Sequence, residues 1–170
     1  MKTAWARRKG FTIVELLIVI VVIGILAAIT IVAYNGIQTR ARDTQRASDL
    51  SSIVKALEIY RTTNGLYPAA TSTAGAGSWE ESNETAGTFM EYLNVSKTPT
   101  DPTNNGTYRY RYHRYNAGYG GCTASRGAYY VLIALFESAS SKPTGSGLNC
   151  PSYVLTDSGT QYIMAKYENE

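Results

Sequence analysis

The sequence predicts an α+β protein in which one long N-terminal helix packs against a C-terminal antiparallel β-sheet of about four strands. Residues 11–65 keep a helical pattern, first apolar and then amphipathic, with no proline inside it. After Pro68 the chain becomes rich in Tyr, Ser, Thr, Gly and Asn, with short stretches of strand character. An apolar helix stripe and one face of the sheet would then bury each other.

The first part of the helix is long and apolar enough to span a membrane. Residues 16–33 are all Leu, Ile, Val or Ala except Gly24 and Thr30. Such a segment extends about 27 Å as a helix, close to the ~30 Å hydrocarbon core of a bilayer. Three cations precede it at residues 7–9, which predicts a cytoplasmic N-terminus. We therefore expect a single-pass protein of the cytoplasmic membrane, with the remainder of the chain outside.

A single acid, Glu15, stands at the start of the apolar segment. A carboxylate in lipid costs on the order of a few kcal/mol, so it needs a partner, which we expect on another molecule. A secretory signal peptide is one alternative, but its apolar core is usually ~7–15 residues long and ends at a small-x-small cleavage site. A generic membrane anchor is another, but it leaves both Glu15 and the Lys9-Gly10-Phe11 junction unexplained.

The segment Lys9-Gly10-Phe11-Thr12-Ile13-Val14-Glu15-Leu16 resembles the processing site of type IV prepilins and of the pseudopilins of type II secretion. The resemblance implies that a membrane-embedded prepilin peptidase cuts between Gly10 and Phe11 and then N-methylates Phe11. It also implies that Glu15 serves assembly. At one position the chain differs: Val32 stands where many pilins have a proline, which leaves open whether the helix melts near Gly24 in a filament.

By this resemblance the chain divides into three parts. These are a cleaved leader (1–10), a long helix (11–65) that carries the membrane and polymerisation segment (16–33), and a globular pilin head (66–170). The mature protein would be a structural subunit of an extracellular type IV pilus. Its partners would be other pilin subunits, the prepilin peptidase and an inner-membrane assembly platform.

Two other functions stay open. The Tyr67-Pro68 helix exit and the Pro99-Thr100-Asp101-Pro102 turn are similar to those of a major pseudopilin of a type II secretion system. The long 69–88 segment and the two cysteines favour a pilus. A DNA-binding minor pilin of a competence pilus is the third candidate, with nucleic acid as its partner.

The two cysteines, Cys122 and Cys150, are expected to form one disulfide, because the head is extracytoplasmic. The bridge would close a loop of about 29 residues and stabilise the head by roughly 3–4 kcal/mol on the chain-entropy model. Two buried free thiols are the alternative. Many pilins close the end of the head with a disulfide, which supports the bridge.

Residues 108–113 alternate tyrosine with basic residues and predict a strand, with the tyrosines facing inward and Arg109, Arg111 and His113 facing solvent. We expect 69–88 to be a loop anchored by Trp79. Three further strands are expected at 129–136, 152–155 and 161–167, the last two forming a hairpin around Asp157-Ser158-Gly159.

The arginines at 109, 111 and 114 are the residues that could contact DNA, since arginines interleaved with aromatics can bind phosphates and stack bases. A plain strand with a charged outer face explains the same residues. The net charge of +3 does not favour nucleic acid, because residues 1–10 hold four cations and no acid, leaving twelve cations against thirteen anions. His113 is the only histidine and has no catalytic partners at suitable spacing, so we expect no enzyme and no cofactor.

A metal site is also not expected. A calcium-binding turn at Asp101, Asn104 and Asn105 is a weak alternative, because few acids converge there.

The mature chain should begin at Phe11 and carry an N-methyl group on that residue. The peptidase must read the boundary between the cationic leader and the apolar helix, so Gly10→Val should leave unprocessed precursor in the membrane. Intact-mass analysis of the protein from membranes measures both outcomes. A chain that starts at Met1, or beyond Ala28, would contradict this prediction.

Overall fold

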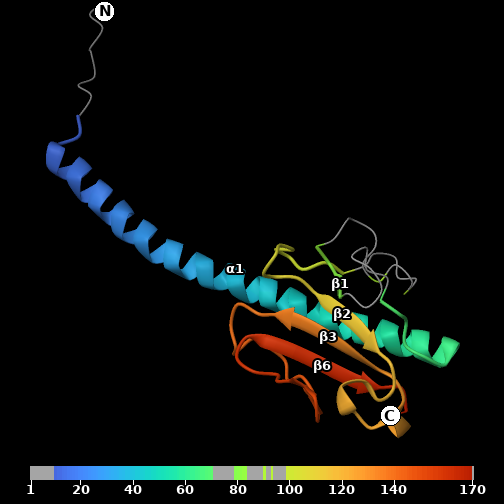
Figure 1. Cartoon of the computed structure of the whole chain (residues 1–170). Coiled ribbons are helices and arrows are strands. Elements are labelled where there is room, and N and C mark those ends of the chain that lie inside the picture. The colour runs from blue at the N-terminus through green and yellow to red at the C-terminus, as the bar shows by residue number, and fades with distance from the viewer. Residues whose placement is uncertain (1–9, 71–78, 84–89, 91–92, 94–98, 170) are drawn as a thin grey trace, which may run out of the picture. The chain divides into compact units, whose positions relative to one another are not determined.

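The computed structural model describes residues 10–70, 79–83, 90, 93 and 99–169, and it confirms the α+β fold. One long helix, α1 (Ile13–Asn64), is followed by a C-terminal antiparallel sheet (Figure 1). The chain forms two compact units, Met1–Gln38 and Thr39–Glu170, and α1 contributes to both. Each unit is described by itself below.

Helix α1 ends where the sequence predicts. Gly65 adopts a φ of +81°, a left-handed conformation that glycine reaches without a steric penalty. Its N–H donates to the carbonyl of Arg61 at 2.7 Å, which satisfies one of the last helical acceptors. The helix passes through Gly24 without interruption.

The main sheet has four antiparallel strands in the order β1-β2-β3-β6. They are β1 (Glu80–Glu81), β2 (Arg111–Tyr115), β3 (Tyr129–Leu135) and β6 (Gln161–Tyr167). A separate hairpin consists of β4 (Leu148–Cys150) and β5 (Tyr153–Leu155), and two short 3₁₀ turns lie at Tyr119–Gly121 and Ala124–Arg126. β3 is nearly all apolar because it is paired on both edges and covered on both faces.

The main core lies between α1 and the inner face of the sheet. Leu50, Ile53 and Leu57 form a stripe on α1 that is almost completely buried. They pack with aromatic and aliphatic side chains of the strands, including Tyr112 and Leu132. Burying one such aliphatic side chain stabilises the fold by about 1.5–3 kcal/mol, so this stripe holds the C-terminal part of α1 to the sheet.

The outer face of the sheet is largely covered, and the expected solvated face is wrong. The β4–β5 hairpin and the segment around Cys122 contribute to a second apolar cluster on this face. His113 is only 8% exposed and lies against Trp79 and Tyr115, with ring centroids 5.7 and 4.3 Å away. The buried members of the cluster are Tyr115, Cys122, Tyr129, Val131, Ile133, Leu148, Cys150, Ile163 and Tyr167.

The expected hairpin between 152–155 and 161–167 is also wrong. β5 pairs with β4 across the two-residue Pro151-Ser152 turn, and β6 pairs with β3 along seven residues. The Asp157 carboxylate accepts the N–H of Ile163 at 3.0 Å, which holds the connection between β5 and β6 in a loop. The longer pairing with β3 places β6 in the main sheet.

Strand β2 begins at Arg111, later than expected. The Asn105 side chain accepts the N–H groups of Thr107 and Tyr108 at 2.9 and 2.8 Å, and the Asn105 N–H donates to the Tyr108 carbonyl. This Asx turn uses the backbone groups that a strand would need. The 69–88 segment contains β1, which was expected to be loop, and Trp79 beside it packs against the second cluster.

A buried ion-pair network joins α1 to the strand connections. Arg46 is fully buried and donates to Asp101 at 2.7 Å, to Asp43 at 2.8 Å and to Glu137 at 3.0 Å. Asp43 also accepts the backbone N–H groups of Glu137 and Ser138 at 2.9 and 3.0 Å. Because both Asp101 oxygens face this guanidinium, the carboxylate is not placed to hold calcium.

Arg46→Leu should destabilise the head by about 3–5 kcal/mol, because the carboxylates of Asp43 and Asp101 would stay buried without their cation. Arg40→Leu is the matched control: Arg40 is exposed on the same helix, and its loss should change the unfolding free energy by less than about 0.5 kcal/mol. Chemical denaturation followed by circular dichroism measures both. Equal stability of the two variants would contradict this role of Arg46.

Candidate processing and assembly site

The N-terminal end of α1 is capped by its own side chains. The hydroxyl of Thr12 accepts the N–H of Glu15 at 3.2 Å. The Glu15 carboxylate accepts the Thr12 N–H at 2.8 Å and its hydroxyl at 2.7 Å. These reciprocal bonds form a capping box, which satisfies donors that a helix start otherwise leaves unpaired.

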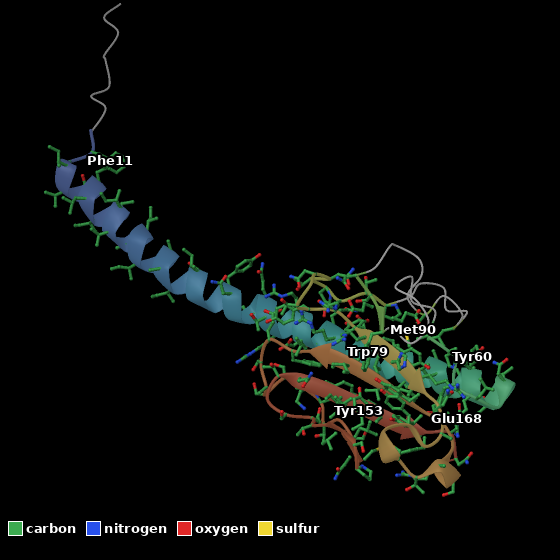
Figure 2. The ribbon with its side chains drawn as sticks, in the orientation of Figure 1. Phe11, Tyr60, Trp79, Met90, Tyr153 and Glu168 are labelled. Atoms are coloured by element: carbon green, nitrogen blue, oxygen red, sulfur yellow. A yellow bond between two sulfur atoms is a disulfide. The ribbon has the colours of Figure 1, made fainter. Side chains whose placement is uncertain are left out.

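Glu15 therefore has hydrogen-bond partners within the chain, and a further partner on another molecule stays a prediction. The signal that could have revealed these bonds is Thr12-x-x-Glu15 directly before the apolar run. Gly10 and Phe11 precede the capping box, and both are exposed (Figure 2). The junction predicted for cleavage thus lies just before the first turn of α1, outside the helix.

The apolar segment that follows exposes a continuous hydrophobic surface. Within α1 this segment is long and apolar enough to cross a membrane, and none of it is buried by the rest of the chain. Thr30 is a polar residue of this segment, and its hydroxyl donates to the carbonyls of Leu26 and Ala27 at 2.5 and 3.1 Å. That bonding removes an unsatisfied donor from the surface, which suits contact with lipid.

The three arginines that were considered for DNA contact each face a carboxylate of the head. Arg109 and Arg111 both contact Glu81, at 2.8 and 2.9 Å. Arg114 donates to Glu168 through Nε and Nη2 at 2.9 and 2.7 Å. These guanidinium groups therefore serve contacts inside the head.

Glu168 anchors the C-terminal end of β6 to the end of α1. Besides Arg114, its carboxylate accepts the N–H of Tyr67 at 3.1 Å. The carbonyl of Glu168 accepts a hydrogen bond from Arg61. In the part of the chain that the structure describes, no three His, Cys, Asp or Glu side chains are grouped to hold a metal ion.

Hydrogen bonds in the Arg46 network stabilise the ionised forms of Glu137 and Arg46. Hydrogen bonds from Arg42 lower the pKa of Glu137 from 4.5 to about 2, assisted by Arg46, while burial opposes the shift. Burial alone would lower the pKa of Arg46, but hydrogen bonds to Asp101, Glu137 and Asp43 raise it above its ordinary value. Both groups are therefore ionised at neutral pH.

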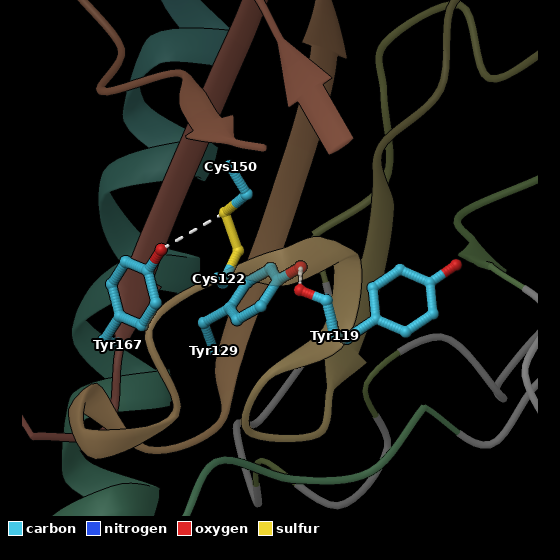
Figure 3. Close-up of a disulfide and its surroundings, with 5 residues drawn as sticks. All are labelled: Tyr119, Cys122, Tyr129, Cys150 and Tyr167. Carbon is cyan, nitrogen blue, oxygen red and sulfur yellow. Dashed lines mark hydrogen bonds between the residues drawn. A yellow bond between two sulfur atoms is a disulfide. The ribbon is translucent and has the colours of Figure 1, made fainter. Parts of the chain in front are cut away.

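The structure joins Cys122 to Cys150, with their Cα atoms 4.8 Å apart. The bridge connects the segment before β3 to the end of β4 (Figure 3). The hydroxyl of Tyr167 lies 3.5 Å from the Cys150 sulfur, and Tyr129 belongs to the same apolar cluster as the two cysteines. The disulfide thus fixes the hairpin over the outer face of the sheet.

Helix α1 begins with a segment long and apolar enough to span a membrane, and its C-terminal part packs on an antiparallel sheet. This combination defines a membrane-anchored subunit of the pilin and pseudopilin class. Residues 5–31 match the family model described as the prokaryotic N-terminal methylation motif. Residues 34–122, more than half of the chain, match the model of type II secretion system (T2SS) protein G. The chain belongs to the T2SS protein G family.

Individual relatives include both core protein G of type II secretion and a type IV pilin. The type II secretion system core protein G of Vibrio cholerae is 27% identical over 104 residues, which cover 61% of this chain and 70% of that protein. Its counterpart in Escherichia coli K12 is 29% identical over 102 residues, covering 58% and 69%. The type IV major pilin PilE of Neisseria gonorrhoeae is 31% identical over 98 residues, covering 58% and 57%. No solved structure matches the chain.

Acidification should weaken the head between pH 4.5 and 2. The pKa of Glu137 is lower in the folded state than its ordinary value, so ionised Glu137 stabilises the fold above pH 4.5, and this contribution is lost as the pH falls toward 2. Glu137→Gln should lower stability at pH 7 and flatten this part of the pH dependence. Thermal unfolding of the full chain in detergent between pH 7 and 2.5 measures it. If the unfolding temperature of the wild type and of Glu137→Gln changed with pH in parallel, the stabilising role of ionised Glu137 would be contradicted.

Proposed function

We propose that this protein is the major subunit of a type II secretion pseudopilus. The precursor is cut between Gly10 and Phe11 by a prepilin peptidase, Phe11 is N-methylated, and an inner-membrane assembly platform polymerises the subunits. The observation that carries the proposal is the match of residues 34–122 to the protein G family, which covers α1 from residue 34 onward and strands β1 and β2. The sequence motifs alone favour a pilus, whereas the relatives named core protein G favour the secretion system.

An extracellular type IV pilus is the second candidate. The similarity to the Neisseria gonorrhoeae pilin and the Cys122–Cys150 bridge favour it. Both candidates share processing, membrane insertion before assembly and a non-enzymatic, structural role. DNA binding through the arginines has less support, since Arg109, Arg111 and Arg114 face Glu81 or Glu168.

Deleting the gene in its own host distinguishes the two systems. If the protein is a pseudopilin, export of proteins to the medium should fall while surface filaments persist. If it is a pilus subunit, the filaments should disappear while export is unchanged. Complementation with the wild-type gene should restore the property that was lost. If the deletion left both the filaments and protein export unchanged, both candidates would be contradicted.

In assembly, the Glu15 carboxylate would exchange its contacts with Thr12 for the methylated amine of Phe11 on a neighbouring subunit. Two opposite charges that meet in a low-dielectric bundle attract strongly, whereas either charge left alone there costs several kcal/mol. In the single chain the Thr12 N–H and hydroxyl hold the carboxylate, and these are the donors that a neighbouring amine would replace.

Glu15→Val should abolish filaments or reduce them sharply while expression, insertion, cleavage and head folding continue. Thr12→Ala is the matched control, since it removes the capping hydroxyl and keeps the acid. Electron microscopy of filaments, with intact mass to verify processing, measures both variants. Normal filaments from Glu15→Val would refute the assembly role. Equal loss in a correctly processed Thr12→Ala would assign the effect to helix capping.

A further inference from the structure

The outer side of the head carries a hollow that assembly through α1 does not use. Its volume is about 390 Å³, within the range of small-molecule sites. Aromatic and polar side chains face it from the end of β2 and the segment that follows. They are His113, Arg114, Tyr115, Asn116 and Tyr119, with Ala69 and Ala70 after the end of α1.

The hollow adjoins a group of aromatic rings in mutual contact. Tyr115 stacks on Tyr119 with ring centroids 4.6 Å apart and an angle of 24° between the rings. Tyr153 meets both rings edge-on, at 5.3 and 5.8 Å, and Trp79 meets Tyr115 at 6.3 Å. Tyr119 is 52% exposed, so this group presents an uncovered aromatic surface beside the hollow.

This aromatic surface is held rigidly. Tyr119 precedes Cys122 by three residues, and the bridge from Cys122 to Cys150 ties its segment to the hairpin that carries Tyr153. The Gly120 carbonyl accepts the N–H of Ser152 at 2.8 Å. A Cβ at Gly120 would lie 2.4 Å from the Cβ of Tyr153, so the two segments touch at a position that only glycine fits. Figure 3 shows the Tyr119 ring directed away from the disulfide.

Charge at the hollow is balanced. Arg114, which lines the hollow, is paired with Glu168. Arg111 lies outside the lining, with its guanidinium 4.8 Å from the centre of the Trp79 ring, and is paired with Glu81. An anionic ligand such as a nucleic acid would have to compete with these carboxylates. The exposed Asn116 side chain makes no hydrogen bond to the residues that the structure describes, so its amide is available to a neutral polar ligand.

We propose that this hollow binds a neutral pyranose unit of a polysaccharide. The aliphatic C–H face of a sugar ring packs on the exposed Tyr119 ring, and its hydroxyl groups exchange hydrogen bonds with the Asn116 amide, which both donates and accepts. The bridged, preformed arrangement of Tyr115, Tyr119 and Tyr153 reduces the cost of ordering side chains on binding. The site would let the subunit contact glycans of the cell envelope or of an exported substrate.

The test titrates maltohexaose, cellohexaose and chitohexaose separately into the full chain, purified in a zwitterionic detergent that contains no sugar. Binding is followed by saturation-transfer NMR and calorimetry. At least one glycan should bind, and Tyr119→Ala should weaken that binding about tenfold or more, the scale of a lost aromatic contact. Tyr119→Phe keeps the ring and should retain binding. Ile59→Ala, an exposed site on α1, should leave it unchanged.

Three results would overturn the proposal. The first is no binding of any of the three glycans to the folded wild-type chain. The second is glycan binding that Tyr119→Ala leaves intact while circular dichroism shows that the variant is folded. The third is tighter, Tyr119-dependent binding of a single-stranded thymidine oligonucleotide than of the glycans, which would assign the aromatic surface to nucleic acid instead.

Discussion

The architecture of the head depends on the buried charge of Arg46. Carboxylates from α1, from the turn before β2 and from the end of β3 converge on its guanidinium: Asp43, Asp101 and Glu137. A buried charge without a partner is strongly unfavourable, so neither strand connection can leave α1 without a large cost. The apolar stripe on α1 supplies most of the free energy that holds the helix to the sheet. Apolar contacts are not directional, so the stripe alone would let the helix shift along the sheet. The ion pairs fix where along α1 the sheet docks.

Tyrosines add to this specificity from the sheet side. Their rings fill the core, and their hydroxyl groups need partners once water is excluded. Tyr110 donates to Asp49 at 2.9 Å, Tyr67 to Glu58 at 2.8 Å, and Tyr112 to the carbonyl of Pro68 at 2.7 Å. Two of these acceptors lie on α1 and the third lies just after it. A shift of α1 along the sheet would break such bonds as well as the Arg46 network.

Features with local signals could be predicted from the sequence. The apolar run, the amphipathic stripe and the Gly65 cap each depend on neighbouring residues, and they predicted the course of α1 correctly. The pairing of short strands is different, because many partners fit three residues equally well. The covered outer face, the β4–β5 hairpin and the strand at Glu80–Glu81 depend on contacts between distant segments, which the sequence pattern does not specify.

In the candidate site, too, the local features could be predicted from the sequence and the contacts between distant segments could not. The junction at Gly10 and the acid at Glu15 stand out in the sequence, and the capping motif that starts at Thr12 was also readable there. The carboxylate partners of Arg109, Arg111 and Arg114 could not be predicted from the sequence, because Glu81 and Glu168 lie on other strands or segments.

The capping box also constrains the energetics of the proposed assembly step. A hydrogen bond to a charged group contributes about 1.5–3 kcal/mol net, so Glu15 would leave Thr12 only where a new partner replaces these bonds. The helix N-terminus favours a negative charge at this position in either state. Within a single chain the Glu15 carboxylate therefore keeps hydrogen-bond partners. A neighbour that presents an amine in a dry helical bundle offers a stronger interaction, because Coulomb attraction increases as water is excluded. This difference would favour the filament over the isolated subunit without requiring any change in the head.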